Sequence, residues 1–297
     1  VVGELPESVG RKNILIIDDS PSVRMMLRKI LNTKFEVVEA SSAEEADRVL
    51  SSRPFHLITL DLNLPGENGV DWLKRARKGR MVTPVVIVSD SSPSEAENIF
   101  GALEGGAQDY IVKSELSQNP NKVMDVVQSL SAGRTSETVS YQVRPFRMEK
   151  IRPELVAIGA STGGPEALAH VLRDLPVDLP PILIVQHMSP EFLKAFALRL
   201  QAVSGLLLAE VNDGVPLSKG RIYLATEDYH LHVVRQSGQL FAVKGSQGPV
   251  HGHRPCVDAL FQSIAHLQVE CVAALLTGMG RDGADGLYEL AKTEKCF

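Results

Sequence analysis

Three residues that could serve as nucleophile, base and orienting acid each follow an apolar run of the sequence. Ser161 comes after ELVAIGA, His187 after PPILIVQ, and Asp282 shortly after CVAALLTGMG. Such runs are typical of buried parallel strands, whose carboxyl ends share one edge of a doubly wound sheet. We therefore expect the three side chains to converge at that edge, where a serine nucleophile could carry out acyl transfer.

The sequence GASTG around Ser161 matches the pattern G-x-S-x-G, in which a strand, a tight turn and a helix expose a serine hydroxyl. His187 is a candidate base because imidazole is largely neutral at pH 7, and Asp282 could fix its tautomer. Taken singly, a surface histidine or a turn aspartate has an ordinary structural explanation. The order Ser, His, Asp also differs from the order in α/β-hydrolases, so the motif predicts a triad without predicting that fold.

The glycine-rich segment TGMGRDG has two interpretations. Gly278 and Gly280 would let the backbone approach a reacting carbonyl, so the amides of Thr162 and Met279 are candidates for an oxyanion hole. The segment also contains G-x-G-x-x-G, a pattern of dinucleotide-binding sites. That pattern usually opens a domain, with an acidic residue about 20 positions further on, whereas here it lies near the end of the chain. We therefore favour the hydrolase interpretation over nicotinamide binding.

Length and composition predict a globular protein of two domains. The chain has 297 residues, of which 44% are hydrophobic and 23% are charged, and one core rarely extends beyond roughly 250 residues. The net charge of -5 argues against a nucleic-acid partner, which requires a basic surface. Three widely spaced cysteines fit neither a disulfide framework nor a zinc site. No segment resembles a signal peptide or a membrane span, so we expect a cytoplasmic protein without direct membrane insertion.

Residues 12–130 alternate short β-branched runs with amphipathic stretches, in a fivefold βα pattern that predicts a five-stranded parallel sheet. Asp18 and Asp19 end the first predicted strand and Asp61 ends the third. Three carboxylates would thus meet at one edge of the sheet, where their repulsion calls for a cation such as Mg²⁺. Lys113 ends the fifth strand at the same edge. A lysine facing an acidic pocket is suited to holding a phosphoryl group on a carboxylate.

The motifs IIDDS, LDLNLPGENG, VSD and DYIVK stand in the order found in receiver domains of two-component response regulators, and residues 12–130 resemble that flavodoxin-like family. The resemblance implies that Asp61 accepts a phosphoryl group from a histidine kinase. The residues that it implies for Mg²⁺ binding and for the conformational switch are Asp18, Asp19, Asp61 and Asn63, and Ser89, Tyr110 and Lys113, respectively.

Two positions depart from the receiver pattern. Ser114 follows Lys113 where the family commonly has proline, and Asp90 stands where a small residue is usual. The added charge of Asp90 could slow phosphorylation. The alternative for the acidic residues as a set is that they merely cap helices at loop tips.

Residues 131–152 lose the periodicity and are predicted to be an interdomain linker, after which residues 153–297 form the second domain. The motifs GASTGG, QHMSPEF, HGHRPCVDALFQSI and TGMGRDG resemble the catalytic domain of the chemotaxis protein-glutamate methylesterases, the CheB family. This resemblance implies a doubly wound, mostly parallel α/β domain. Family members continue beyond the position of Phe297, so we expect this domain to be shortened at its carboxyl end.

The family's chemistry is a phosphorylation-regulated serine hydrolysis that demethylates glutamate methyl esters and deamidates some glutamines on the cytoplasmic domains of chemoreceptors. The resemblance implies that Ser161, His187 and Asp282 form the triad, that ester hydrolysis needs no cofactor, and that phosphorylation relieves inhibition by the receiver. The alternative is a phosphorylation-dependent binding module whose esterase-like domain is inactive.

The segment HGHRP is expected to border the substrate groove through His253 and Arg254. His251 and His253 also suggest a zinc site, but no third or fourth ligand stands at a typical metal-site spacing. The sequence therefore argues against zinc in this segment.

Overall fold

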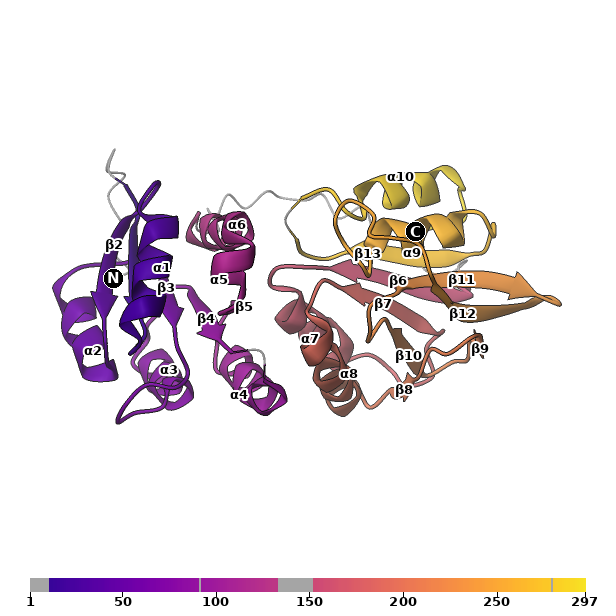
Figure 1. Cartoon of the computed structure of the whole chain (residues 1–297). Helices are drawn as coiled ribbons and strands as arrows, with labels where there is room; N and C mark the ends of the chain where they lie inside the picture. Colours follow the sequence, from indigo (N-terminus) through magenta and orange to yellow (C-terminus); the bar gives the residue numbers. More distant parts are fainter. Residues whose placement is uncertain (1–10, 91, 133–151, 279) are drawn as a thin grey trace. The chain divides into compact units, whose positions relative to one another are not determined.

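The chain folds into two compact units (Figure 1). The computed structural model describes residues 11–90, 92–132, 152–278 and 280–297. Of the predicted linker, residues 133–151 lie outside the described residues, and Ser131 is the last residue of helix α6. The boundaries 12–130, 131–152 and 153–297 therefore remain predictions.

The first unit is a five-stranded parallel sheet in the order β2-β1-β3-β4-β5, as the sequence predicts. Its strands are β1 (Asn13–Ile17), β2 (Glu36–Ala40), β3 (Leu57–Leu60), β4 (Val85–Ser89) and β5 (Asp109–Val112). Its helices are α1 (Pro21–Leu31), α2 (Ala43–Ser52), α3 (Gly69–Lys78), α4 (Pro93–Glu104), α5 (Glu115–Gln118) and α6 (Pro120–Ser131). The helices α1, α5 and α6 contact one another, and α3 contacts α4.

Burial explains why these segments adopt their conformations. Every residue of β3 is buried, as is expected of a parallel strand covered on both faces. Helix α1 buries Val23, Leu27 and Leu31, which recur every four residues and form one apolar face. Helix α2 begins where the hydroxyl of Ser42 accepts a hydrogen bond from the amide of Glu45.

The second unit contains a second five-stranded parallel sheet, in the order β13-β6-β7-β10-β8. Its strands are β6 (Leu155–Ala160), β7 (Ile182–Gln186), β8 (Leu207–Ala209), β10 (Arg221–Leu224) and β13 (Cys271–Leu275). Its helices are α7 (Gly164–Arg173), α8 (Pro190–Ser204), α9 (Val257–Ala265) and α10 (Ala284–Lys292). The parallel α/β class is thus confirmed for both units.

A separate antiparallel sheet, which the sequence analysis did not predict, completes the second unit. It contains β9 (Val215–Pro216), β11 (His230–Gln236) and β12 (Gln239–Gly245) in the order β11-β12-β9. Ser237 and Gly238 join β11 to β12 with φ values of 49° and 83°. Two central residues with positive φ are the mark of a tight hairpin.

The helices of the second unit cover opposite faces of its parallel sheet. Helices α7 and α8 pack together on one face, while α9 and α10 pack together on the other, with α9 also against β11 (Figure 1). Large buried side chains such as Tyr223 and Phe261 fill the core between sheet and helices. Within the described residues, no helix is both long and apolar enough to cross a membrane.

Candidate functional site

The three residues proposed as a triad lie at the carboxyl ends of three neighbouring strands. Ser161 follows β6, His187 follows β7, and Asp282 lies in the loop between β13 and α10. These strands are adjacent in the order β13-β6-β7, so the turns that follow them share one edge of the sheet. The structure therefore brings together the residues that the sequence suggested would converge there.

The side chains of these residues form a continuous hydrogen-bonded chain. His187 Nδ1 lies 3.2 Å from Ser161 Oγ, and His187 Nε2 lies 2.7 Å from Asp282 Oδ2. Because a carboxylate only accepts, Nε2 carries the proton and Nδ1 is left to accept from the serine hydroxyl. The arrangement suits a neutral imidazole acting as a general base toward Ser161.

The carboxylate of Asp282 is held by donors besides His187. The Cys256 thiol and the Asp258 amide donate to Oδ1 at 2.9 Å each, and the Val257 amide donates to Oδ2 at 2.8 Å. Burial opposes ionisation, but the hydrogen bonds from His187, Cys256, Asp258 and Val257 outweigh it and hold the pKa of Asp282 well below its ordinary value. Asp282 is therefore a carboxylate at neutral pH.

Two of these donors come from the first residues of α9, whose free amides favour an anion. Burial and the hydrogen bond to Asp282 raise the pKa of Cys256 to about 12, so its thiol stays protonated and acts as a donor. Sequence analysis missed this role of Cys256. The residues PCVD do indicate the start of a helix. The sequence does not show which side chain lies opposite that helix start.

The turn that carries Ser161 is fixed by Gln186, a second residue that sequence analysis missed. Gln186 is 1% exposed, and its side-chain amide donates to the carbonyls of Ser161 at 2.9 Å and His187 at 3.1 Å. A Cβ on Gly164 would lie 2.0 Å from Gln186 Oε1, so only glycine fits there. Gly163 provides the left-handed turn, with a φ of 72°, so Ser161 itself needs no unusual backbone.

A cavity of about 220 Å³ opens beside Ser161 and His187, lined also by Leu275 and Gly278. A Cβ on Gly278 would lie 3.1 Å from the Cβ of Ser161, so a glycine keeps this approach open. Thr162 follows Ser161 in the turn before α7, while Met279 lies outside the described residues. The oxyanion hole formed by these two amides therefore stays a prediction.

The segment HGHRP contributes a stacking contact to the site. The rings of His253 and His187 are parallel within 4°, with their centroids 4.0 Å apart. Arg254 Nε donates to Asp228 Oδ1 at 2.5 Å, and Arg254 Nη1 donates to the carbonyl of Gln247 at 3.3 Å. The groove roles expected for His253 and Arg254 remain predictions. The nearby His251 is not part of this stack.

The first unit brings its predicted phosphorylation residues together at the carboxyl edge of its sheet. Asp18 and Asp61 are each 1% exposed, and the ligand atoms of Asp18, Asp19 and Asp61 lie within 4.8 Å of one another. Lys113 Nζ donates to Asp61 Oδ2 at 3.0 Å and lies 3.7 Å from Asp18 Oδ2. Asn63 also contacts this group, because its backbone amide donates to Asp61 Oδ1 at 3.3 Å.

This carboxylate pocket has the electrostatics of a cation site. Burial, followed by the nearby charge of Asp61, raises the pKa of Asp18 to about 6. Asp18 Oδ2 is buried without a hydrogen-bond partner among the described residues. Carboxylate oxygens grouped in this way are the ligands that Mg²⁺ prefers. The residues present therefore fit a divalent cation.

The remaining receiver residues lie on or shortly after the strands β4 and β5. The Ser89 hydroxyl donates to Glu95 at 3.1 Å, and Tyr110 lies half-buried on β5. Asp90 is exposed, and Ser114 is the N-cap residue of α5. Burial opposes the charge on Lys113, but the hydrogen bond and charge of Asp61, with Asp18 and Asp90 beyond it, raise its pKa. Asp90 thus acts on the pocket through Lys113.

Two family models match the chain, one in each unit. The family model described as CheB methylesterase matches residues 156–296, and that described as response regulator receiver domain matches residues 14–127. The protein-glutamate methylesterase/protein-glutamine glutaminase 2 of Shewanella sp. (strain MR-7) is 38% identical over 92% of this chain and 83% of its own length. The chain belongs to the CheB methylesterase family.

The chain is also similar to two further proteins of this family. The protein-glutamate methylesterase/protein-glutamine glutaminase 1 of Caulobacter vibrioides is 37% identical over 96% of this chain and 86% of its own length. The CheB methylesterase catalytic domain of Thermotoga maritima is 35% identical, covers 48% of this chain and 77% of its own, and superposes with a TM-score of 0.46. Membership in the CheB family removes the dinucleotide-binding interpretation of TGMGRDG.

Proposed function

We propose that this protein is a phosphorylation-regulated serine hydrolase that demethylates glutamate methyl esters on chemoreceptors and deamidates some receptor glutamines. The curated relatives are named as enzymes of both activities, which supports the esterase over an inactive binding module. The observation that carries the proposal is the hydrogen-bonded chain from Ser161 through His187 to Asp282 beside an open cavity.

In the proposed mechanism, Ser161 Oγ attacks the ester carbonyl while its proton passes to His187 Nδ1. The buried carboxylate of Asp282 stabilises the imidazolium through the 2.7 Å hydrogen bond to Nε2. His187 then returns the proton to the departing methanol. Water attacks the acyl-enzyme with the same base and leaves glutamate and the free serine. A glutamine substrate follows the same steps with ammonia as the leaving group.

The turn after β6 and the loop after β13 are proposed to bind the oxyanion, through the amides of Thr162 and Met279. Both amides would have to point at the oxygen that gains charge in the transition state. The close approach of Gly278 to Ser161 supports this arrangement. His253 and Arg254 are proposed to border the groove that receives the receptor segment.

Regulation is proposed to act through Asp61, which would accept a phosphoryl group from a histidine kinase. Asp18, Asp19, Asp61 and the carbonyl of Asn63 would hold Mg²⁺, which neutralises charge on the phosphoryl oxygens. Lys113, now paired with Asp61, would bind a phosphoryl oxygen, and Ser89 and Tyr110 would change conformation. The enzyme would act in the cytoplasm, on receptor domains that reach into it.

Methanol release from methylated receptor tests this function. We would compare the wild type with Ser161→Ala and with Ser218→Ala, a matched change at an exposed serine, each with and without a phosphoryl donor and Mg²⁺. Release should rise with the donor, persist in Ser218→Ala and disappear in Ser161→Ala. Release that survives in Ser161→Ala would overturn the assignment of the nucleophile, and a lack of stimulation in the wild type would overturn the regulation.

A further inference from the structure

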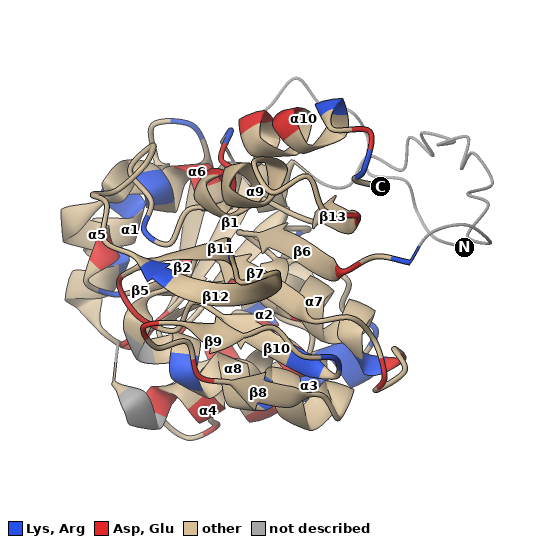
Figure 2. Ribbon diagram, turned by 90° about the vertical axis from the view of Figure 1, so that its right-hand side faces the viewer, with Lys and Arg blue, Asp and Glu red and all other residues tan. Residues whose placement is uncertain are grey.

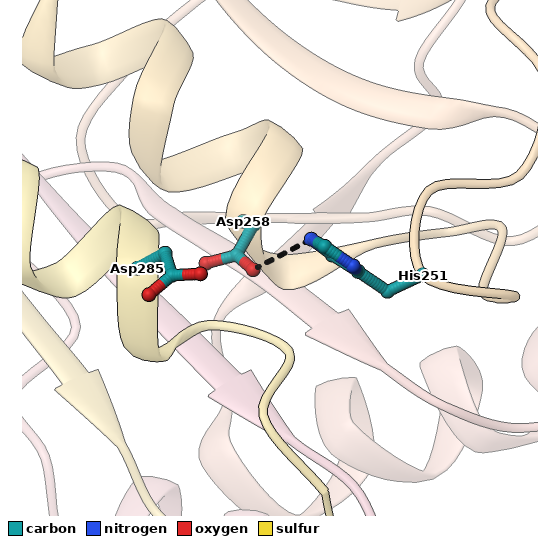
Figure 3. Close-up of side chains that lie close together, drawn as sticks. All are labelled: His251, Asp258 and Asp285. Carbon is teal, nitrogen blue, oxygen red and sulfur yellow. Dashed lines mark ion pairs between the residues drawn. The ribbon is translucent and has the colours of Figure 1, made fainter.

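A second group of polar side chains lies outside the Ser161 site, between the starts of two helices and a turn. His251 lies in the turn between the bridged residues Val250 and His253, Asp258 is the second residue of α9, and Asp285 is the second residue of α10. One ligand atom from each of His251, Asp258 and Asp285 lies within 4.8 Å of the others. Figure 3 shows Asp258 between the other two side chains.

The buried carboxylate of Asp258 lacks a partner that its environment demands. Asp258 is 1% exposed, and its Oδ1 accepts a hydrogen bond from the Gly286 amide at 2.6 Å. Among the described residues, its Oδ2 has no hydrogen-bond partner. A buried carboxylate oxygen left in this state destabilises the fold. Oδ2 faces His251 Nε2. We therefore expect a ligand or ion between these two atoms that bonds to both.

The spacing of these atoms favours a cation over a direct hydrogen bond. His251 Nε2 lies 3.9 Å from Asp258 Oδ2, which is too long for a hydrogen bond. Zinc bonds to histidine nitrogen and carboxylate oxygen are each about 2.1 Å long, so one ion can span this gap. One imidazole and two carboxylates also form a ligand set of the kind that Zn²⁺ accepts, with water in the remaining position.

The charges around the group permit a cation. The competing cation is Arg281, whose Nη2 lies 2.8 Å from Asp285 Oδ1, but its side chain is 80% exposed. An exposed pair at this i,i+4 spacing contributes only about 0.3–0.5 kcal/mol, so a bound metal can displace it. Figure 2 shows the charged residues of α10. The next acid along this helix after Asp285 is Glu289, which pairs with Lys292.

We propose that His251, Asp258 and Asp285 bind one divalent cation of the zinc class. Sequence analysis considered a zinc site formed by His251 and His253. In the structure, His253 stacks on His187, and the other ligands of the proposed site come from α9 and α10. It adjoins the triad, since the amide of Asp258 also donates to Asp282. A bound ion would cross-link the turn that carries His253 to both helices.

Isothermal titration with Zn²⁺ tests the proposal on the full chain, with a reductant and with excess Mg²⁺ to occupy the first unit. The wild type should bind one Zn²⁺ saturably. His251→Gln and Asp285→Asn should each weaken binding by about tenfold or more, because each removes a ligand. The matched controls are His266→Gln, an exposed histidine of α9's carboxyl end, and Glu289→Gln, an exposed acid of α10.

Neither test variant is expected to unfold, because both side chains lie at the surface end of the group, whereas Asp258 also accepts from Gly286. Circular dichroism would verify the fold of each protein, and Zn²⁺ should raise the melting temperature of the wild type and of the controls more than that of either test variant. Absence of binding to the wild type would overturn the proposal. Undiminished binding by either His251→Gln or Asp285→Asn would also overturn it, because the ion would then lie elsewhere.

Discussion

Replacing Asp282 by asparagine changes one oxygen of a carboxylate that accepts from four donors among the described residues. In one orientation the asparagine oxygen still accepts from His187 and Val257, and the Asp258 amide loses its acceptor. In the other, the new NH₂ group donates to His187 Nε2, and the Val257 amide loses its acceptor. The proton of the imidazole must then move to Nδ1, which can no longer accept from Ser161.

The second orientation should dominate, because NH₂ finds a good acceptor in His187 and only a weak one in the Cys256 sulfur. Reaching the transition state then requires the asparagine to turn back and the imidazolium to form beside a neutral amide. Losing the hydrogen bond to a charged group raises the barrier by about 1.5–3 kcal/mol, and rotating the asparagine side chain back adds about 1 kcal/mol. The sum, about 2.5–4 kcal/mol, corresponds to a kcat about 70- to 900-fold lower.

Methanol release under saturating substrate would measure this loss, with Asp213→Asn, an exposed aspartate of the same unit, as the control. The amide left without an acceptor should lower the free energy of unfolding by about 1–3 kcal/mol, so denaturation is measured alongside activity. A folded Asp282→Asn protein whose kcat stays within about tenfold of the wild type would refute the argument from these hydrogen bonds.

Two further predictions concern packing and pH. Gly164→Ala should lower the free energy of unfolding by about 1–3 kcal/mol and reduce kcat, because its Cβ would lie 2.0 Å from Gln186 Oε1. The control is Gly248→Ala, which has open space at its Cβ and should change little in the same denaturation experiment. Equal stability of the two variants would contradict the role given to Gln186. The pKa of Asp18 is about 6 when folded against 3.8 as the unperturbed value, so the folded state holds this proton more tightly. Without Mg²⁺, stability should therefore fall by about 3 kcal/mol as pH rises from about 4 to about 6. Asp18→Asn should remove that fall, and parallel pH profiles of the two proteins in EDTA would refute the assignment.

The convergence of Ser161, His187 and Asp282 could be predicted because parallel strands align their carboxyl ends. The rule needs only the apolar runs and their order, and it served equally well for Asp18, Asp61 and the first sheet. It does not give atomic detail. Which nitrogen of the histidine faces the serine depends on the placement of the loop after β13, which no local pattern encodes.

Contacts between distant segments explain what the sequence analysis missed. Cys256 reaches Asp282 only because α9 begins beside the loop after β13, and Asp258 meets Asp285 through the packing of α9 against α10. Local spacing, on which the search for metal ligands relied, does not report such pairs. The hairpin of β11 and β12 was also missed, although it could have been predicted. The residues RQSGQ, between two alternating runs, are a recognisable turn signal.

Asp282 is held by neutral amides, a thiol and one imidazole, with no lysine or arginine among the described donors. Ionic strength acts mainly on exposed charges, whereas the side chain of Asp282 is 2% exposed. The strength of this anchor is therefore independent of the surface charges of the second unit. Substitutions among those charges should therefore leave the ionised state of Asp282 unchanged.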